Sequence, residues 1–326
     1  MNEKNDKRTY LCECTSFAFV SGDTVCLDFI WPGPAPKAGQ FFLVKPRRTG
    51  VFLTRPLSMA GWEPVMYGPA NEIDRRFIAE RRTRTEIITD TTTHNNRKIE
   101  RRKNNDRRTE PGGIIRFYVT RRGRGSRELS DLRPGEEAEL SGPLGNSWPL
   151  GLFPTVHPTV RPAVHATVRP VVHATERHKA KQAGAFALIG GGVGIAPLLP
   201  LAAEIKKRPF DFYAGFRTGA YGLENLKPRA LIISTEDGSQ GVKGRILDFF
   251  NISGYIGVFA CGPEPMLKEL ADVCVAGSIP CFVSTERSMA CGVGACLGCK
   301  VKTTKGDLRC CADGPIFNAE EMYFEG

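Results

Sequence analysis

The chain has 326 residues, of which 41% are hydrophobic and 25% are charged, a composition typical of a soluble globular protein with room for two or three compact units. Its first residues are polar, which argues against a secretory leader, and no apolar run approaches the roughly 20 residues that span a bilayer. We therefore expect a cytoplasmic protein that does not associate with a membrane.

The formal net charge of +10 lies mainly in two segments rather than on a folded face. Residues 71–110 hold 12 Lys and Arg against 8 Asp and Glu, and residues 152–181 hold 5 against 1, so the two segments account for +8. The rest of the chain is nearly neutral, which argues against a nucleic-acid-binding surface on the folded body.

Residues 1–150 favour a small antiparallel β-barrel. Strand-like runs at 11–20 and 24–30 flank a Ser-Gly-Asp turn, and 40–44 and 114–119 are further apolar strands. Helical periodicity is scarce in this region, as expected for a barrel.

Two low-complexity segments interrupt the predicted domains. Residues 70–111 are polar and poor in core-forming side chains, which indicates an insertion in a hairpin loop of the barrel. Residues 151–182 contain an octapeptide repeated about three times, and its prolines favour an extended linker between two domains. All five histidines lie in these segments: His94, His157, His165, His173 and His178. We therefore expect no His-based catalysis and assign no catalytic residue.

Residues 183–280 alternate strands and helices in the manner of a doubly wound α/β domain with a parallel sheet. The predicted strands cover 185–189, 210–216, 230–234 and 257–261. The predicted helices cover 196–207 and 264–276, with helical turns at 223–226 and 244–250.

A glycine-rich loop, Gly190-Gly191-Gly192-Val193-Gly194-Ile195-Ala196-Pro197, follows the first of these strands and opens the first helix. A backbone without Cβ atoms can approach a pyrophosphate closely, and a helix N-terminus supplies N–H donors. A plain tight turn is the alternative, but the strand–turn–helix context favours a nucleotide site. The spacing of these glycines differs from the G-x-G-x-x-G motif of the dehydrogenases. This difference predicts another kind of nucleotide-binding fold.

Two motifs in the predicted barrel suit a phosphorylated ligand. In Arg55-Pro56-Leu57-Ser58 the arginine can pair with a phosphate and the serine can hydrogen-bond a ring nitrogen, although a chance turn is the alternative. The glycines and hydroxyl of Gly123-Arg124-Gly125-Ser126 can cradle phosphate. The turn-rich segment 142–146 then forms the exit from the barrel.

Five of the eleven cysteines lie within the 21 residues 291–311. Cys291, Cys296 and Cys299 have the C-x4-C-x2-C spacing of [2Fe–2S] ligation, and either Cys310 or Cys311 can supply the fourth ligand on spacing alone. A structural zinc site would more often show two C-x2-C pairs. We therefore predict a small [2Fe–2S] subdomain at 281–326.

These motifs, together with Cys261-Gly262-Pro263, resemble the ferredoxin–NADP reductase superfamily. The cysteine-rich tail, ending in Cys311-Ala312-Asp313-Gly314-Pro315, resembles the electron transfer subunits of NAD+-linked dihydroorotate dehydrogenases. The resemblance implies an FAD site formed by Arg55, Pro56, Leu57, Ser58, Tyr118, Val119, Thr120, Gly125 and Ser126. It implies an NAD site formed by Gly191, Gly192, Gly194, Cys261, Gly262 and Pro263. It implies that Cys291, Cys296, Cys299 and Cys311 ligate the cluster.

The resemblance also implies a partner, an FMN-containing catalytic subunit that oxidises dihydroorotate, in a heterotetramer. Electrons would then pass from FMN through the cluster and FAD to NAD+. A related alternative is the flavin/iron–sulfur subunit of an NAD(P)H–ferredoxin oxidoreductase or sulfide dehydrogenase, since Arg217 after a strand can hold the 2′-phosphate of NADP. An alternative of another class is a basic protein that binds a partner or nucleic acid through its inserts.

Overall fold

The computed structural model describes residues 8–47, 50, 53–65, 112–153 and 184–324. The predicted insertion at 70–111, the octapeptide repeat and the five histidines lie outside the described residues. Within the described part of the chain, no helix is long and apolar enough to cross a membrane.

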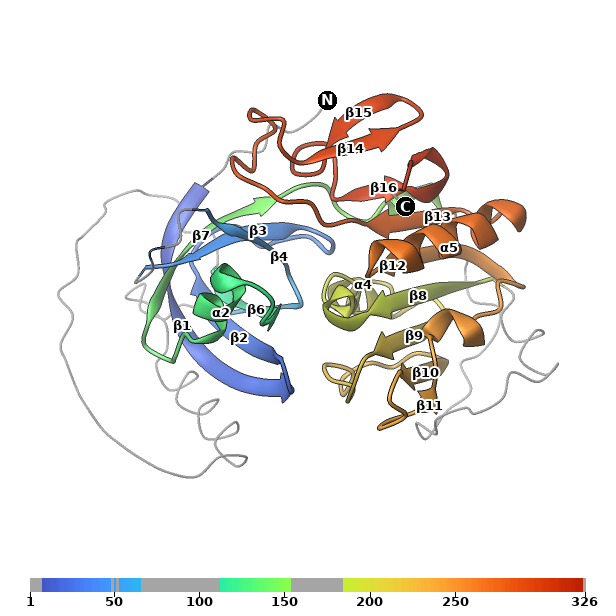
Figure 1. The fold of residues 1–326 in the computed structure, drawn as a ribbon, viewed down its shortest axis with the longest axis horizontal. Helices are drawn as coiled ribbons and strands as arrows, with labels where there is room; N and C mark the ends of the chain where they lie inside the picture. The colour runs from blue at the N-terminus through green and yellow to red at the C-terminus, as the bar shows by residue number, and fades with distance from the viewer. Residues whose placement is uncertain (1–7, 48–49, 51–52, 66–111, 154–183, 325–326) are drawn as a thin grey trace.

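The N-terminal sheet of the described chain has seven antiparallel strands in the order β4-β3-β7-β1-β2-β6-β5 (Figure 1). Its strands are β1 (Arg8–Ser21), β2 (Thr24–Trp31), β3 (Phe41–Pro46), β4 (Arg55–Ser58), β5 (Gly61–Pro64), β6 (Gly113–Thr120) and β7 (Glu137–Leu144). The sheet curls until β4 also lies against β6, which confirms the predicted barrel architecture.

Side chains at alternate positions of the strands line the inside of this curved sheet. In β2, the side chains of Leu27, Phe29 and Trp31 are fully buried inside the barrel. The Trp31 ring packs edge-on against Phe42, with 4.9 Å between ring centroids. The short helix α2 (Arg124–Ser130) lies within the curve of the sheet and buries Leu129 in the same core (Figure 1).

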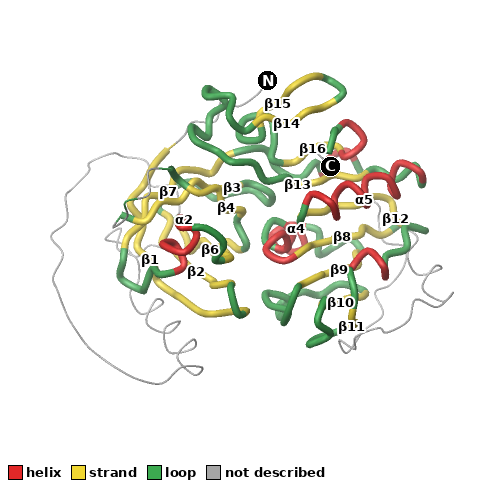
Figure 2. The backbone as a smooth tube through the Cα atoms, viewed as in Figure 1, coloured by secondary structure: helices red, strands yellow, loops and turns green. Residues whose placement is uncertain are grey.

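The second sheet has the order β11-β10-β9-β8-β12-β13-β16 and is parallel except for β16. Its strands are β8 (Ala185–Gly191), β9 (Phe210–Phe216), β10 (Ala230–Thr235), β11 (Val242–Lys243), β12 (Tyr255–Cys261), β13 (Cys281–Ser284) and β16 (Ile316–Asn318). The helix α4 (Leu198–Glu204) covers one face and α5 (Glu264–Ala276) covers the other (Figures 1 and 2). The predicted doubly wound α/β domain is confirmed.

Both helices follow from the sequence, but one is shorter than predicted. The bounds of α5 coincide with the predicted helix 264–276. The predicted helix 196–207 forms only as α4, Leu198–Glu204, because the 3-10 turn η3 (Gly192–Ile195) occupies the loop before it. The chain leaves α4 at Ile205, and residues 205–207 form a turn before Pro209.

The C-terminal region is mostly loop and turn (Figure 2). It contains the antiparallel hairpin of β14 (Lys300–Thr303) and β15 (Gly306–Arg309), and β16 then returns to the edge of the second sheet. The 3-10 turn η5 (Ala319–Glu321) follows β16. Elsewhere, η4 (Ile246–Phe249) lies between β11 and β12, and η2 (Leu150–Leu152) follows β7.

A buried polar network ties the second sheet together at Asp211, which is 2% exposed. The Arg229 guanidinium donates to both Asp211 carboxylate oxygens, at 3.1 and 2.9 Å. The Tyr255 hydroxyl donates to Asp211 Oδ2 at 2.8 Å, and the Tyr213 hydroxyl lies 2.9 Å from that of Tyr255. The carboxylate therefore accepts hydrogen bonds from the residue that precedes β10 and from the first residue of β12.

We expect Asp211→Ala to lower the free energy of unfolding by about 3–5 kcal/mol, because buried donors of Arg229 and Tyr255 lose their acceptor. Urea unfolding followed by tryptophan fluorescence measures the change. Asp307→Ala is the control, because its ion pair with Lys300 is exposed and is worth about 0.5 kcal/mol. Equal losses in the two variants would show that the Asp211 network is not stabilising.

Candidate functional site

The glycine-rich loop and the Cys261-Gly262-Pro263 turn meet at the carboxyl ends of adjacent parallel strands. Gly190 on β8 pairs in register with Cys261 on β12. A Cβ atom on Gly194 would overlap the Cys261 carbonyl group, and one on Gly191 would lie 2.8 Å from Pro263 Cδ. Glycine is therefore required at both positions for the two turns to pack.

This meeting point is the topological switch point of the second sheet. From β8 the chain proceeds through β9 and β10 to one edge, and through β12 and β13 to the other. In open α/β sheets the crevice at such a point is where ligands bind. The predicted nucleotide residues, Gly191, Gly192, Gly194, Cys261, Gly262 and Pro263, all lie here.

On the barrel, the structure brings Arg55 together with the N-terminus of α2. The Arg55 guanidinium lies so close to Gly125 that a Cβ atom there would overlap it. Arg55 Nη1 also donates to the Leu53 carbonyl at 3.0 Å, which orients the side chain. A guanidinium beside a helix N-terminus is a favourable environment for a phosphate.

Ser126 shapes this loop through its hydroxyl. Ser126 Oγ accepts hydrogen bonds from the N–H groups of Arg122 and Gly123, at 2.9 and 3.0 Å, and lies 3.0 Å from the Gly123 carbonyl, to which it donates. The hydroxyl is therefore engaged by the backbone of residues 122–123. Its role in the site is to hold the turn at which α2 begins.

The predicted β6 residues face different surroundings. Val119 is buried in the barrel core, so its side chain cannot reach a ligand, and Thr120 Oγ1 lies 3.0 Å from Thr24 Oγ1. Tyr118 points out of the barrel toward the second sheet, where its ring packs against Tyr221 with centroids 5.1 Å apart. Burial raises the pKa of Tyr118, so this phenol stays protonated and can act as a hydrogen-bond donor.

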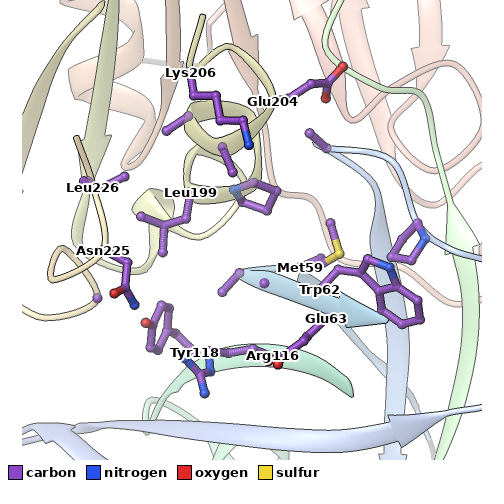
Figure 3. A pocket seen from close by; sticks show the side chains of 18 of the residues that line it. Met59, Trp62, Glu63, Arg116, Tyr118, Leu199, Glu204, Lys206, Asn225 and Leu226 are labelled. Carbon is purple, nitrogen blue, oxygen red and sulfur yellow. The ribbon is translucent and has the colours of Figure 1, made fainter. Parts of the chain in front are cut away.

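A cleft of about 830 Å³ lies beside Tyr118, between the barrel and α4 (Figure 3). Trp62 and Tyr118 line its barrel wall, and Leu199 and Asn225 line the opposite wall. Sequence motifs gave no indication of this cleft, because its lining comes from separate strands and loops.

An ion pair lies in the barrel wall of the cleft. Arg116 donates to both oxygens of the buried Asp28 carboxylate, at 2.7 Å each. These hydrogen bonds raise the pKa of Arg116 further above its ordinary value. The pair joins β2 to β6, and it keeps the Arg116 guanidinium positively charged in the wall of the cleft.

Four cysteines in the C-terminal loops form two pairs. Cys299 Sγ lies 3.3 Å from Cys311 Sγ, and the Cys296 N–H lies 3.5 Å from Cys291 Sγ. The Cys291 and Cys296 side chains are also within hydrogen-bonding range of each other. A cluster of two irons takes four thiolates, so two pairs fit it better than one convergent set. Accordingly, among the described residues no three acidic, His or Cys side chains converge on a single ion site.

Backbone N–H groups point at the sulfur atoms of these pairs. The Gly294 N–H lies 3.1 Å from Cys311 Sγ, and the Val293 N–H lies 3.4 Å from Cys291 Sγ. Gly292 and Gly294 have φ values of +73° and +80°, which let the loop turn its amides inward. Partial burial raises the pKa of the Cys291 thiol, but the N–H donors, above all that of Cys296, outweigh it and lower the pKa to about 6. Such donors stabilise thiolates that ligate iron.

Cys310 and Cys311 point in different directions. Cys310 Sγ is buried and donates to the Thr285 carbonyl at 3.2 Å, whereas Cys311 Sγ faces Cys299. The two Sγ atoms thus have different partners, and only the Cys311 thiol lies beside another of the predicted ligands. Geometry therefore favours Cys311 over Cys310 as the fourth ligand.

We expect Cys311→Ala to lose the cluster, because only three thiolates remain. Cys310→Ala should keep it and lose about 1 kcal/mol of stability, the typical worth of one hydrogen bond. Iron and acid-labile sulfide analysis after anaerobic reconstitution distinguishes the variants. A cluster that survives in Cys311→Ala and is lost in Cys310→Ala would reverse the assignment.

Comparisons with known proteins agree with this geometry. Residues 286–323 match the model of the iron-sulfur cluster binding domain of dihydroorotate dehydrogenase B. In folding, the chain resembles the structure of an NADH-dependent reduced ferredoxin-NADP oxidoreductase, with a TM-score of 0.64 and 21% identity over 97% of this chain and 90% of that one. It also resembles a ferredoxin reductase of carbazole 1,9a-dioxygenase, with a TM-score of 0.52 and 18% identity over 84% of this chain and 67% of that one.

Curated relatives extend the likeness to most of the chain. The electron transfer subunit of dihydroorotate dehydrogenase B (NAD(+)) from Clostridium acetobutylicum is 35% identical over 210 residues, which are 64% of this chain and 74% of the relative. The subunit of the same name from Clostridium perfringens is 34% identical over 219 residues, or 65% of this chain and 77% of the relative. The chain therefore belongs to the family of dihydroorotate dehydrogenase B (NAD+) electron transfer subunits.

Proposed function

We propose that this chain carries electrons from an FMN-containing dihydroorotate dehydrogenase subunit, through a [2Fe–2S] cluster and FAD, to NAD+. The observation that carries the proposal is the pairing of Cys291 with Cys296 and of Cys299 with Cys311 beside a barrel and a nucleotide crevice. When bound, a flavin exchanges hydride with a nicotinamide and single electrons with an iron–sulfur centre.

Each cofactor is assigned to its own part of the chain. We assign FAD to residues 1–150, NAD to residues 183–280 and the cluster to residues 281–326. Arg55 and the turn at Gly125 would hold the FAD phosphates, and Ser58 and Tyr118 would contact its ring system. The backbone of Gly191–Gly194 and the Cys261–Pro263 turn would hold NAD.

The strand ends near Arg217 support NAD over NADP. The Asp237 N–H donates to the Arg217 carbonyl at 3.3 Å, and the Glu236 N–H donates to the Phe216 carbonyl at 3.0 Å, so the backbone of two acidic residues runs beside that of this arginine. All three side chains are exposed. Acidic groups at such a strand end suit ribose hydroxyls and disfavour a 2′-phosphate.

The cluster loop carries an apolar surface that suits a partner subunit. Leu297 is 64% exposed and Val293 is 42% exposed, on either side of the exposed ligand Cys296. Leu297 has a φ of +58°, a conformation that costs energy for a residue other than glycine. Large apolar side chains held outward around a ligand are typical of a docking surface. We assign the catalytic subunit to it.

The proposal is tested by anaerobic co-purification with a dihydroorotate dehydrogenase catalytic subunit. Visible spectra are recorded after dihydroorotate is added and again after NAD+ is added. We expect dihydroorotate to bleach the flavin and cluster bands of the complex, and NAD+ to restore them as NADH forms. A chain that nicotinamide reduces, but that neither binds this subunit nor responds to dihydroorotate, would belong to a ferredoxin-linked reductase instead.

Two matched variants locate the docking surface in the same experiment. Leu297→Asp should abolish co-purification, because it places a charge in the apolar contact. Leu152→Asp should not, because Leu152 is 70% exposed on η2, outside the cluster loop. Both variants should keep their flavin and cluster.

We expect Arg55→Ala to raise the Kd for FAD by roughly 10- to 100-fold, since a hydrogen bond to a charged group is worth about 1.5–3 kcal/mol. Fluorescence titration of the cofactor-free chain with FAD measures this affinity. Arg47→Ala is the matched control, because Arg47 pairs with Glu137 on the barrel surface. Unchanged FAD affinity in Arg55→Ala would remove Arg55 from the site.

A further inference from the structure

The segment that leaves the barrel, residues 142–146, is joined by hydrogen bonds to the turn that follows Cys311. Asn146 Nδ2 donates to the carbonyls of Asp313 and Ile316, at 3.2 and 2.9 Å, and Asn146 Oδ1 accepts the Ile316 N–H at 3.0 Å. The Asn146 N–H also donates to the Gly314 carbonyl at 2.7 Å. One asparagine thus engages backbone groups of three residues. The partners of its side chain lie 167 and 170 positions further along the chain.

Close packing reinforces these hydrogen bonds. A Cβ atom on Gly145, which has a φ of +77°, would lie 2.7 Å from the Gly314 carbonyl oxygen. A Cβ atom on Gly292, beside Cys291, would lie 2.6 Å from Leu43 Cδ1 and 3.1 Å from Leu144 Cδ1. The cluster loop therefore rests directly on β3 and β7 of the barrel, and Figure 1 shows these strands beneath the C-terminal region.

Asn146 reaches the cluster cysteines through one further clamp. Asp313 accepts hydrogen bonds from the Arg309 N–H and Nε, at 2.7 Å each, and from Arg309 Nη2 at 2.9 Å. This clamp closes the turn of residues 309–313, which contains Cys311. Because Asn146 binds the Asp313 carbonyl, the turn that carries Cys311 is fixed relative to the barrel.

We propose that Asn146 is a positioning residue for electron transfer: it holds the turn that carries Cys311 against the barrel and so sets the separation between flavin and cluster. The inference rests on the proposed function, because it requires FAD in the barrel and a cluster on the four cysteines. Asn146 acts on the backbone of residues 313–316.

The test separates two steps in the cofactor-loaded chain. In anaerobic stopped-flow experiments with NADH, flavin bleaching reports hydride transfer, and the electron paramagnetic resonance signal of freeze-quenched samples reports reduction of the cluster. We expect Asn146→Ala to leave the rate of hydride transfer unchanged and to slow cluster reduction several-fold, because the rate of electron transfer falls steeply as the two carriers move apart.

A second readout needs no cofactor. Asn146→Ala should accelerate amide hydrogen exchange at Ile316 in the cofactor-free chain, because that N–H loses its acceptor. Asn251→Ala is the matched control: Asn251 is also partly buried, but its side chain accepts from the nearby Ser253 N–H at 2.9 Å and makes a local bond. It should change neither the rates nor the exchange at Ile316.

The outcomes are distinct. A wild-type chain whose flavin and cluster are not reduced by NADH would refute the proposed function. Normal reduction in the wild type with both rates unchanged in Asn146→Ala would refute the positioning role. If Asn146→Ala does not retain the cluster, the rates are measured in Asn146→Asp, which keeps the acceptor and loses the donor. If that variant also lacks the cluster, Asn146 is required for cluster binding itself, and the positioning role in electron transfer is refuted.

Discussion

The structure depends on the insertion of the barrel exit into the core of the parallel sheet. Trp148, which is 5% exposed, donates through Nε1 to the Pro197 carbonyl at 2.9 Å and packs edge-on against Phe259. Phe153 packs against Phe259 and Phe186 in the same core. Because an indole and a phenyl ring from the barrel exit share this core, the two sheets cannot separate without exposing it. The crevice between them is therefore held at a fixed width.

That constraint gives the candidate sites their common arrangement. The Gly191–Gly194 loop lies just before Pro197, whose carbonyl Trp148 binds, so the nucleotide crevice is anchored to the barrel. The cluster loop is anchored to the same barrel exit through Asn146. An electron-transfer chain needs its carriers close together and steady. The short segment 142–153 supplies both anchors, and Gly142, Gly145, Trp148 and Phe153 within it are closely packed.

Several features could be predicted from local sequence alone. The strand at 210–216 and the helix at 264–276 formed with the predicted bounds, because their apolar runs and flanking prolines leave few alternatives. Helix 196–207 was predicted too long at both ends, since residues 196–197 continue the turn of the glycine-rich loop and residues 205–207 form a turn before Pro209. The cleft beside Tyr118 gave no sequence signal, because residues from the barrel and from α4 meet there only in the folded protein.

By itself, the sequence determined the fold class, the glycine-rich turn between a strand and a helix, and the cysteine spacing that predicts a [2Fe–2S] site, since each depends on the chemistry of neighbouring residues. Spacing left the adjacent thiols open, the family resemblance implied Cys311, and the tertiary structure favours the same residue: Cys310 binds the Thr285 carbonyl, whereas Cys311 faces Cys299. It also revealed Asn146, whose side-chain partners lie 167 to 170 positions along the chain. Spacing can show which side chains have the right chemistry. The direction of each side chain, and its distant partners, are set by how the sheets and loops pack.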